Sequence, residues 1–322
     1  MRNNKISNLD LFTQAANHNF KKHIKTQSKQ ALVTIDHLVD WNSLILPLEQ
    51  SISRFVRGRK PFSLLVIVKC FILQRIYSLS DPRLEEEIAD RRSFQIFLGL
   101  NSGDSIPDET TICRYRELFA KQGLDKQLFK SFNKQLKAAG MILEKGTLID
   151  ASIKQSYTKP SSNSRDKDAS FLKRGKKTYF GYKAHIGIDS KTKVIHTTEF
   201  TPANIHDSDM FDHLLTGKET AVLADKGYAN EKRKSCLRKD GIYCGILNKA
   251  YRNRPLSAKQ KKRNKKLSSA RNAVERPFAF AKHVLDYDHC SYYTIGRNRF
   301  QFNMNAVIYN LRRWISLSPC PV

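Results

Sequence analysis

Thr147-Leu-Ile-Asp-Ala-Ser152 is the stretch at which the residue pattern of this chain changes from helical to strand-like. Its apolar run ends on Asp150, as expected for an acid at the tip of a buried strand. Ala221-Val-Leu-Ala-Asp-Lys-Gly-Tyr228 repeats this arrangement, with Asp225 directly after the apolar run. The two stretches therefore predict two buried strands, each of which ends on a carboxylate.

A third acid, Glu275, lies in Ser269-Ala-Arg-Asn-Ala-Val-Glu-Arg276, which has the pattern of a helix. Carboxylates from three distant segments can converge on divalent cations, because these hard ions prefer oxygen ligands. Two such cations can drive an in-line attack on a phosphodiester. The three acids together predict the metal site of a phosphoryl-transfer nuclease, although each acid alone is equally compatible with a cap or a surface residue.

The pattern outside these stretches divides the chain into three parts. Residues 1–35 are polar and basic with little periodicity and predict a flexible segment, residues 36–140 predict a helical domain, and residues 141–322 combine strands and helices. Helices are expected over 62–77, 82–99, 109–121 and 124–139, with Asp81 and Asp108 as N-caps and Gly140 as a C-cap. Strands are expected over 146–152, 183–189, 194–200, 221–224 and 241–247, and helices over 206–215, 231–239 and 269–317. This order predicts an α/β fold, a ribonuclease-H-like mixed sheet flanked by helices and preceded by an all-α N-terminal domain.

Net charge points to a polyanionic partner. The chain carries a formal charge of +27, and such an excess repels itself unless a polyanion such as nucleic acid neutralises it. Two segments concentrate basic residues beside the predicted acids, Lys154–Lys183 and Tyr251–Arg271, and we expect loops that grip phosphates there. The alternatives are solvated basic faces, or a basic protein without a specific partner.

The helix predicted over 109–121 has the features of a DNA reader. Its expected exposed side chains include Thr110, Thr111, Arg114 and Arg116, and it follows another helix. Two short helices in succession are compatible with a helix-turn-helix, whose second helix contacts DNA. An ordinary helical bundle with a basic face would have the same local pattern.

Two further features bear on the compartment. The most apolar stretch, Phe62–Leu79, is interrupted by Lys69, Gln74 and Arg75 and therefore reads as a core helix, so we expect no membrane association. The six cysteines have no C-x-x-C spacing. They are expected to be reduced packing thiols, which points to a reducing cytosol.

Five short signatures give the sequence a family resemblance. They are Leu148-Ile-Asp150, Tyr179-Phe-Gly-Tyr-Lys-Ala-His185, Thr201-Pro-Ala-Asn-Ile-His-Asp-Ser208, Asp225-Lys-Gly-Tyr228 and Val274-Glu-Arg276. In this order they resemble a DDE transposase of a bacterial insertion sequence, of the insertion-sequence-five-like family, which has a DDE_Tnp_1-type core and a DUF772-type N-terminal domain. The resemblance extends over roughly Leu44 to Trp314.

The resemblance implies a site, a reaction and a location. Asp150, Asp225 and Glu275 would be catalytic and would bind two Mg²⁺ or Mn²⁺ ions, while Arg271 and Lys282, on the helix of Glu275, would hold DNA phosphates. The enzyme would hydrolyse a phosphodiester at the element end and then join the freed 3′-hydroxyl to target DNA. A homodimer or higher multimer on double-stranded DNA is implied, in the bacterial cytoplasm at the nucleoid. Arg114 and Arg116 would contact the terminal inverted repeats.

One departure from the family keeps two alternatives open. The family's Tyr-Arg-Glu-Lys signature has Ser268 at the Tyr position, so an aromatic side chain that could contact terminal DNA is missing. This favours slightly a catalytically silent, transposase-derived DNA-binding protein, whereas the three intact acids argue against it. The other alternative is a nuclease with the same core that cuts DNA without transposing it.

Overall fold

A computed structural model describes residues 11–22, 27–52, 61–101, 103–158 and 166–318, and the chain divides into two compact units. The first unit runs to Gln135 and includes the chain end from Ser318, and the second unit is Leu136–Leu317. The division falls inside a helix, before the boundary at Gly140 that the sequence suggests. Residues 159–165 of the basic segment Lys154–Lys183, and Cys320, one of the six cysteines, lie outside the described residues.

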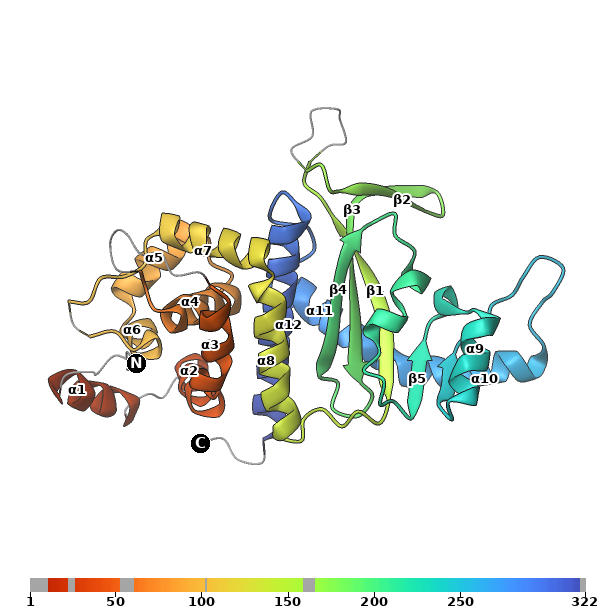
Figure 1. Ribbon diagram of the computed structural model, residues 1–322, viewed down its shortest axis with the longest axis horizontal. Coiled ribbons are helices and arrows are strands. Elements are labelled where there is room, and N and C mark those ends of the chain that lie inside the picture. The colour runs from red at the N-terminus through yellow and green to blue at the C-terminus, as the bar shows by residue number, and fades with distance from the viewer. Residues whose placement is uncertain (1–10, 23–26, 53–60, 102, 159–165, 319–322) are drawn as a thin grey trace. The chain divides into compact units, whose positions relative to one another are not determined.

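The described part of the first unit is all helical (Figure 1). Its core surrounds α4, where Phe71 and the Phe119 ring of α7 meet edge-on with ring centroids 5.4 Å apart. Both side chains are fully buried. The helices are α1 (Leu11–Lys22), α2 (Gln27–Leu38), α3 (Trp41–Ser51), α4 (Leu64–Ile76), α5 (Asp81–Asp90), α6 (Arg92–Leu98), α7 (Glu109–Gln122) and α8 (Leu124–Ala138), the last of which continues into the second unit.

Two segments of the first unit differ from the sequence expectation in their secondary structure. Residues 1–35, which were expected to form a flexible segment, contain α1 and most of α2, which ends at Leu38. Residues 1–10 and 23–26 lie outside the described residues. The signal that reveals α2 is the spacing of Leu32, Ile35 and Val39, which are all buried at three- and four-residue intervals.

The helix predicted over 82–99 is two helices, α5 and α6. The chain is extended at Arg91, and the Gln95 amide donates to the carbonyls of Ile88 and Ala89 that the break leaves without helical partners. The N-cap of α5 is Ser80, whose hydroxyl accepts from the Arg83 amide, and not Asp81. Asp108 caps α7 and positive-φ Gly140 follows α8, as predicted.

The second unit is built on a six-stranded mixed sheet with the order β2-β3-β1-β5-β6, to which β4 adds alongside β3. β1, β3 and β4 are antiparallel neighbours, whereas β5 runs parallel to both β1 and β6. The strands are β1 (Thr147–Gln155), β2 (Ser170–Arg174), β3 (Lys177–Asp189), β4 (Ile195–Pro202), β5 (Ala221–Ala224) and β6 (Tyr243–Ile246).

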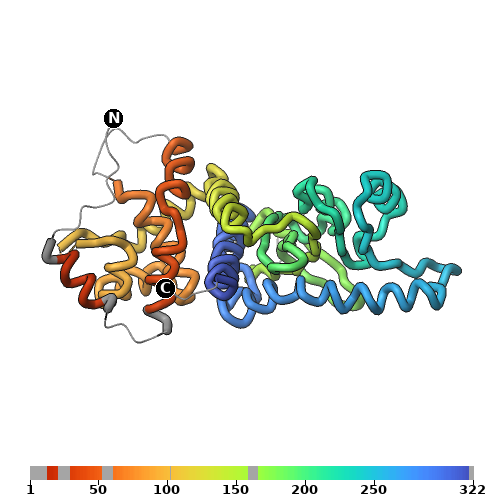
Figure 2. The backbone as a smooth tube through the Cα atoms, turned by 90° about the horizontal axis from the view of Figure 1, so that it is seen from below, coloured from red at the N-terminus to blue at the C-terminus, as the bar shows by residue number. Residues whose placement is uncertain are grey.

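Helices accompany this sheet and complete its core. The helices are α9 (Glu231–Lys239), α10 (Ala258–Arg271), α11 (Glu275–Val284) and α12 (Ile295–Leu317), with 3₁₀ turns η1 (Asp207–Met210), η2 (Asp212–Leu214), η3 (Lys226–Tyr228) and η4 (Asn272–Val274). Figure 2 shows α10, η4 and α11 following one another in a nearly straight run. α12 packs along β4, where the Asn310 side chain bonds both the N–H and the C=O of Ile195 at 2.8 and 2.7 Å. This amide takes the place of a neighbouring strand at the edge of the sheet.

Three segments of the second unit differ from the sequence expectation. Lys154–Lys183 is not a loop over its described part, because β2 and the first half of β3 form a hairpin in which Phe171 and Phe180 pack 5.0 Å apart. Tyr251–Arg271 is largely the helix α10, which begins at a capping box of Ser257 and Gln260. Residues 206–215 form η1 and η2 instead of one helix, because Phe211 and Leu214 both turn into the core.

Candidate functional site

Two of the predicted acids lie at matching positions on neighbouring parallel strands. Ile149 of β1 pairs with Ala224, the last residue of β5, so Asp150 and Asp225 follow at the same level of the sheet. Leu148, Ile149, Val222 and Ala224 are buried, which fixes both strands in the core. The prediction that each strand ends on a carboxylate holds for β5 only, because β1 continues past Asp150 to Gln155. Asp225 follows the carboxyl end of β5, where open α/β sheets place their functional groups.

The third acid, Glu275, is the first residue of α11 and is exposed. Val274, directly before it, is fully buried and anchors this end of the helix. The predicted single helix through Arg271, Glu275 and Lys282 is interrupted by η4, so these residues do not share one regular helical face.

Asp225 and Glu275 lie near enough to Asp150 for their charges to act on its carboxyl. Burial raises the pKa of the Asp150 carboxyl above its usual value, and a hydrogen bond from the Ala151 amide and the Arg271 guanidinium oppose that rise. The negative charges of Asp225 and Glu275 raise the same pKa further. The acids therefore repel one another's charge, which is the electrostatic condition that a bound cation relieves.

Arg271 is the direct counter-charge of Asp150. Its Nη1 lies 3.2 Å from Oδ2 of Asp150, and the two side chains are only 15% and 22% exposed. The pair joins the end of α10 to the central strand β1 across 121 residues of sequence.

The three carboxylates have the oxygen donors that a divalent cation requires. In this structure, Arg271 occupies the side of Asp150 that such a cation would share. Within the described ranges, no three His, Cys, Asp or Glu side chains are gathered as ligands of one ion. Oxygen donors with mutual repulsion are what Mg²⁺ and Mn²⁺ bind best.

Supporting residues hold the loops around Asp225. Arg233 of α9 donates to the Ser208 side chain at 2.8 Å, to the Ser208 carbonyl at 2.7 Å and to the Tyr228 carbonyl at 3.0 Å. It also lies over the Phe211 ring. Arg233 thus ties η1 to η3, a role that its position as the third residue of α9 does not reveal from the sequence.

A second tie involves Lys183 and Asp207. Lys183 of β3 lies 2.9 Å from Asp207 and donates to the Ile205 carbonyl. Beside them, buried His185 bonds Thr201 at 2.9 Å, and burial lowers the pKa of the His185 imidazole to about 4. The buried Tyr228 hydroxyl has no hydrogen-bond partner among the described residues.

The remaining predicted DNA contacts differ in accessibility. Arg114 of α7 is exposed, as predicted. The prediction that Arg116 is exposed is wrong, because it is 3% exposed and forms an ion pair with Asp81 and a hydrogen bond with Gln74. Arg116 comes two residues after the exposed Arg114. Because an α-helix has about 3.6 residues per turn, that step places the two side chains on opposite faces of α7. Lys282 is half exposed and lies 3.3 Å from Asp288.

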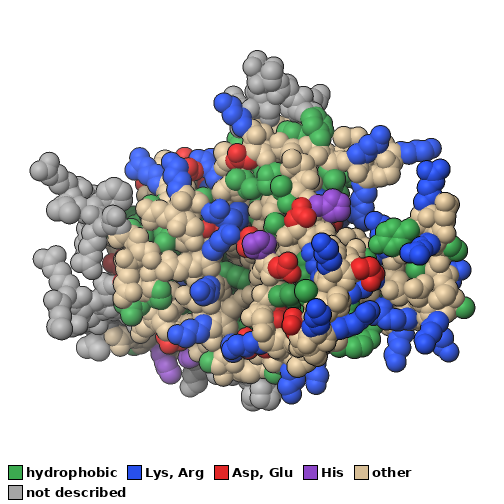
Figure 3. All heavy atoms as spheres, turned by 45° about the vertical axis from the view of Figure 1, so that its right-hand side comes forward, with side chains coloured by type: hydrophobic (Ala, Val, Ile, Leu, Met, Phe, Trp, Pro, Cys, Tyr) green, Lys and Arg blue, Asp and Glu red, His purple; other side chains and the backbone are tan. Residues whose placement is uncertain are grey.

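The distribution of surface charge, the state of the cysteines and the length of the apolar helices can be compared with the sequence predictions. On the face seen in Figure 3, Lys and Arg side chains are spread widely while Asp and Glu are fewer. Among described cysteines none forms a disulfide, but Cys113 and Cys236 are exposed and so are not packing thiols. In the described part of the chain, no helix is both long and apolar enough to cross a membrane.

The sheet and the positions of the three acids together define a fold class for the second unit. A mixed sheet flanked by helices, with one acid on β1, one directly after the parallel strand β5 and one on a later helix, has a ribonuclease-H-like fold. Family comparison narrows this class. Residues 143–311 match the family described as the transposase DDE domain, and residues 18–118 match the transposase domain DUF772. The chain belongs to the DDE transposase family, and its function is that of a transposase.

One solved structure is reported for comparison. The chain is similar to the piggyBac transposase in a cryo-EM structure of its synaptic complex with hairpin DNA, with a TM-score of 0.46 and 10% sequence identity. The match covers 88% of this chain and 72% of that chain.

Proposed function

We propose that this transposase cleaves phosphodiester bonds at the ends of its element and transfers the freed 3′-hydroxyl strand into target DNA, with Asp150, Asp225 and Glu275 as its catalytic acids. The observation that carries the proposal is the charge coupling at Asp150, on which both of the other acids act. Three acids from β1, the end of β5 and the start of α11 share one electrostatic environment. A structural role for three mutually repelling carboxylates would only cost stability.

The three carboxylates would hold two Mg²⁺ or Mn²⁺ ions. When bound, such ions lower the pKa of an attacking water or hydroxyl and stabilise the leaving oxygen. Arg271 would leave Asp150 as the site fills and would then face the phosphate being cut, because a guanidinium pairs with phosphate as it does with carboxylate. Lys282, half exposed on the following helix, would hold a more distant phosphate.

DNA would be held by both units. Arg114 is exposed on α7 and supports a contact to the terminal inverted repeats, while Arg116 is occupied in the core and is not proposed. The charge of +27 supports double-stranded DNA, both element ends and target, as the partner. Two ends must be cut and joined together, so we propose a homodimer or higher multimer on DNA.

The experiment is a cleavage and strand-transfer assay on labelled element-end DNA with Mg²⁺ or Mn²⁺. Asp150→Ala, Asp225→Ala and Glu275→Ala should each bind the DNA and lose at least about 10³-fold in both reactions. Asp212→Ala removes an exposed acid from η2 and serves as the matched control, with activity like that of the parent.

Other outcomes would support different proteins. A parent that binds element ends and never cuts them, with either metal, would be the silent DNA-binding relative that Ser268 favours. A parent that cuts but never joins would be a plain nuclease. Cleavage that survives all three substitutions would refute the assignment of the acids.

A further inference from the structure

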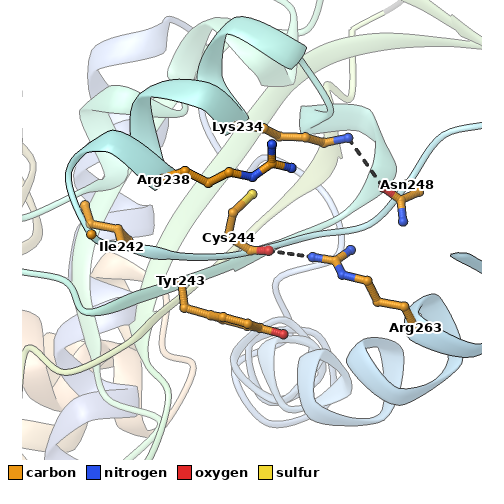
Figure 4. A pocket seen from close by; sticks show the side chains of 8 residues that line it. Lys234, Arg238, Ile242, Tyr243, Cys244, Asn248 and Arg263 are labelled. Carbon is orange, nitrogen blue, oxygen red and sulfur yellow. Dashed lines mark hydrogen bonds between the residues drawn. The ribbon is translucent and has the colours of Figure 1, made fainter.

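A basic hollow lies at the β6 edge of the sheet. It measures about 620 Å³ and is lined by Lys234, Arg238, Gly241, Ile242, Tyr243, Cys244, Asn248 and Arg263 (Figure 4). The lining residues come from α9, from β6 with its flanking loops, and from α10. Its volume is in the range of sites that hold small groups rather than whole duplexes.

One of its three cations is fixed in the fold. Arg263 of α10 donates to the Ile246 carbonyl at 3.0 Å and to the Cys244 carbonyl at 2.5 Å. These alternate carbonyls of β6 face away from β5, because β6 ends the order of the sheet. Arg263 therefore closes the edge strand and brings its positive charge to the wall of the hollow.

The other two cations remain for a ligand. Lys234 is more than nine-tenths buried, yet among the described residues its Nζ bonds only Glu231 at 2.8 Å and Asn248 at 3.5 Å. The Glu231 side chain is 75% exposed, so water screens much of that pair. Arg238 is exposed, and its guanidinium extends over the hollow in Figure 4 without a hydrogen bond or ion pair to any described residue.

The surroundings of the hollow favour a nucleic acid backbone over a free anion. α10 contributes six further cations along its length and no acid (Lys259, Lys261, Lys262, Lys265, Lys266 and Arg271). β6 neighbours β5, whose last residue is followed by Asp225. Adjacent strands are about 4.8 Å apart, so the hollow is within the reach of a few nucleotides from the acids.

We propose that this hollow binds a backbone phosphate of DNA, through Arg238 and Lys234, at a position away from the phosphate being cut. The proposal rests on the proposed function, since it assumes that the acids act on DNA. A phosphate held here would fix the register of a strand relative to Asp150 and Asp225, because phosphate contacts position DNA without reading its sequence.

The first test measures DNA affinity of the full chain against salt concentration, without divalent cation, on a duplex and on a single strand of the same sequence. Arg238→Ala should weaken binding several-fold and reduce the slope of log K against log salt by about 0.9 on duplex or about 0.7 on a single strand. Arg238→Lys should restore most of the affinity. The matched control is Lys239→Ala, the neighbouring exposed cation of α9 that does not line the hollow.

Equal affinity and equal salt slope for Arg238→Ala and the parent would overturn the proposal while leaving the proposed function intact. Equal losses for Arg238→Ala and Lys239→Ala would also overturn it, because diffuse charge would then explain both. A parent that binds no DNA would refute the hollow and the proposed function together.

The second test uses thiol alkylation read by mass spectrometry at single residues. Cys244 lines the hollow and is partly exposed, whereas Cys236 is exposed on α9 and does not line it. DNA should slow alkylation of Cys244 more than that of Cys236, and Arg238→Ala should abolish the difference. Inorganic phosphate that protects Cys244 as well as DNA does, at equal phosphate concentration, would identify a site for free anions and overturn the DNA proposal.

Discussion

The guanidinium of Arg271 lies 3.2 Å from the carboxylate of Asp150, so the last residue of α10 neutralises the acid of the central strand. Both side chains are largely buried, and Asp225 and Glu275 add negative charge to the same place. Arg271 is therefore the group with which any cation entering this site competes.

Removing this counter-charge should destabilise the metal-free protein. Arg271→Ala leaves Asp150 partly buried beside two other acids, and we expect a loss of about 1–2 kcal/mol in the free energy of unfolding. Lys266→Ala, an exposed position of the same helix, should stay within about 0.5 kcal/mol of the parent. Urea unfolding in buffer with a chelator measures both, and equal stability of the two variants would show that the pair contributes nothing.

Substitution of Arg116 should lower stability, whereas substitution of Arg114 should weaken DNA binding. Arg116→Ala breaks a buried ion pair with Asp81 and should cost about 3 kcal/mol or more of stability. Arg114→Ala removes an exposed side chain and should leave stability within about 0.5 kcal/mol while weakening binding to element-end DNA. Thermal unfolding and a DNA-binding titration of both variants decide this, and a stable Arg116→Ala protein would contradict the structural role.

His185 should make the second unit sensitive to acid. Burial lowers its pKa to about 4 from 6.5 despite the nearby Asp207, and Lys183 acts in the same direction as burial. As the pH falls, His185 is therefore protonated in the unfolded chain before it is protonated in the folded protein. The neutral, buried His185 contributes fully to the free energy of unfolding above pH 6.5, and this contribution is lost as the pH falls toward 4. Between pH 7 and pH 5 this loss is about 2 kcal/mol.

The His185→Gln variant provides the measurement. Its unfolding free energy should change less between pH 7 and pH 5 than that of the parent, by about the same 2 kcal/mol. Parallel pH profiles of the two proteins would show that His185 does not titrate in this range on unfolding.

Gly181 should tolerate no side chain. A Cβ at this position, where φ is +151°, would lie 2.2 Å from the Lys154 carbonyl oxygen and 2.8 Å from the Ser156 nitrogen, both backbone atoms. Gly181→Ala should therefore lose more than about 3 kcal/mol. Gly175→Ala, in a turn where φ is +62° and no atom lies within 4 Å, should lose only about 1 kcal/mol from backbone strain. Similar losses at both glycines would mean that β1 moves aside.

The sequence predicted the sheet better than the details of the site. Apolar runs that end on Asp150 and Asp225 identify buried strands, and burial is a local property of a run of residues. Parallel pairing of those strands, which brings the two acids level, depends on a crossover that periodicity does not encode. The hairpin of β2 and β3 was missed because its basic side chains obscure the alternation.

Helix boundaries and side-chain partners were predicted less well, because they too depend on contacts between residues that are distant in the sequence. α10 is so basic that its pattern resembles a loop, and only the Ser257–Gln260 capping box marks its start. Arg116 has the sequence context of a DNA contact, and its ion pair forms with a residue 35 positions earlier. Arg233 likewise acts through η1 and η3, which come together only in three dimensions.

The bonds from Arg263 to β6 also affect how copies of this protein meet one another. An edge strand with open carbonyls invites a strand of a second molecule to add to the sheet, and this is a common start of aggregation. Here the carbonyls of Cys244 and Ile246 are already taken by a bulky cation from α10. A strand of a second molecule would have to displace Arg263 from these carbonyls before it could add to the sheet at this edge.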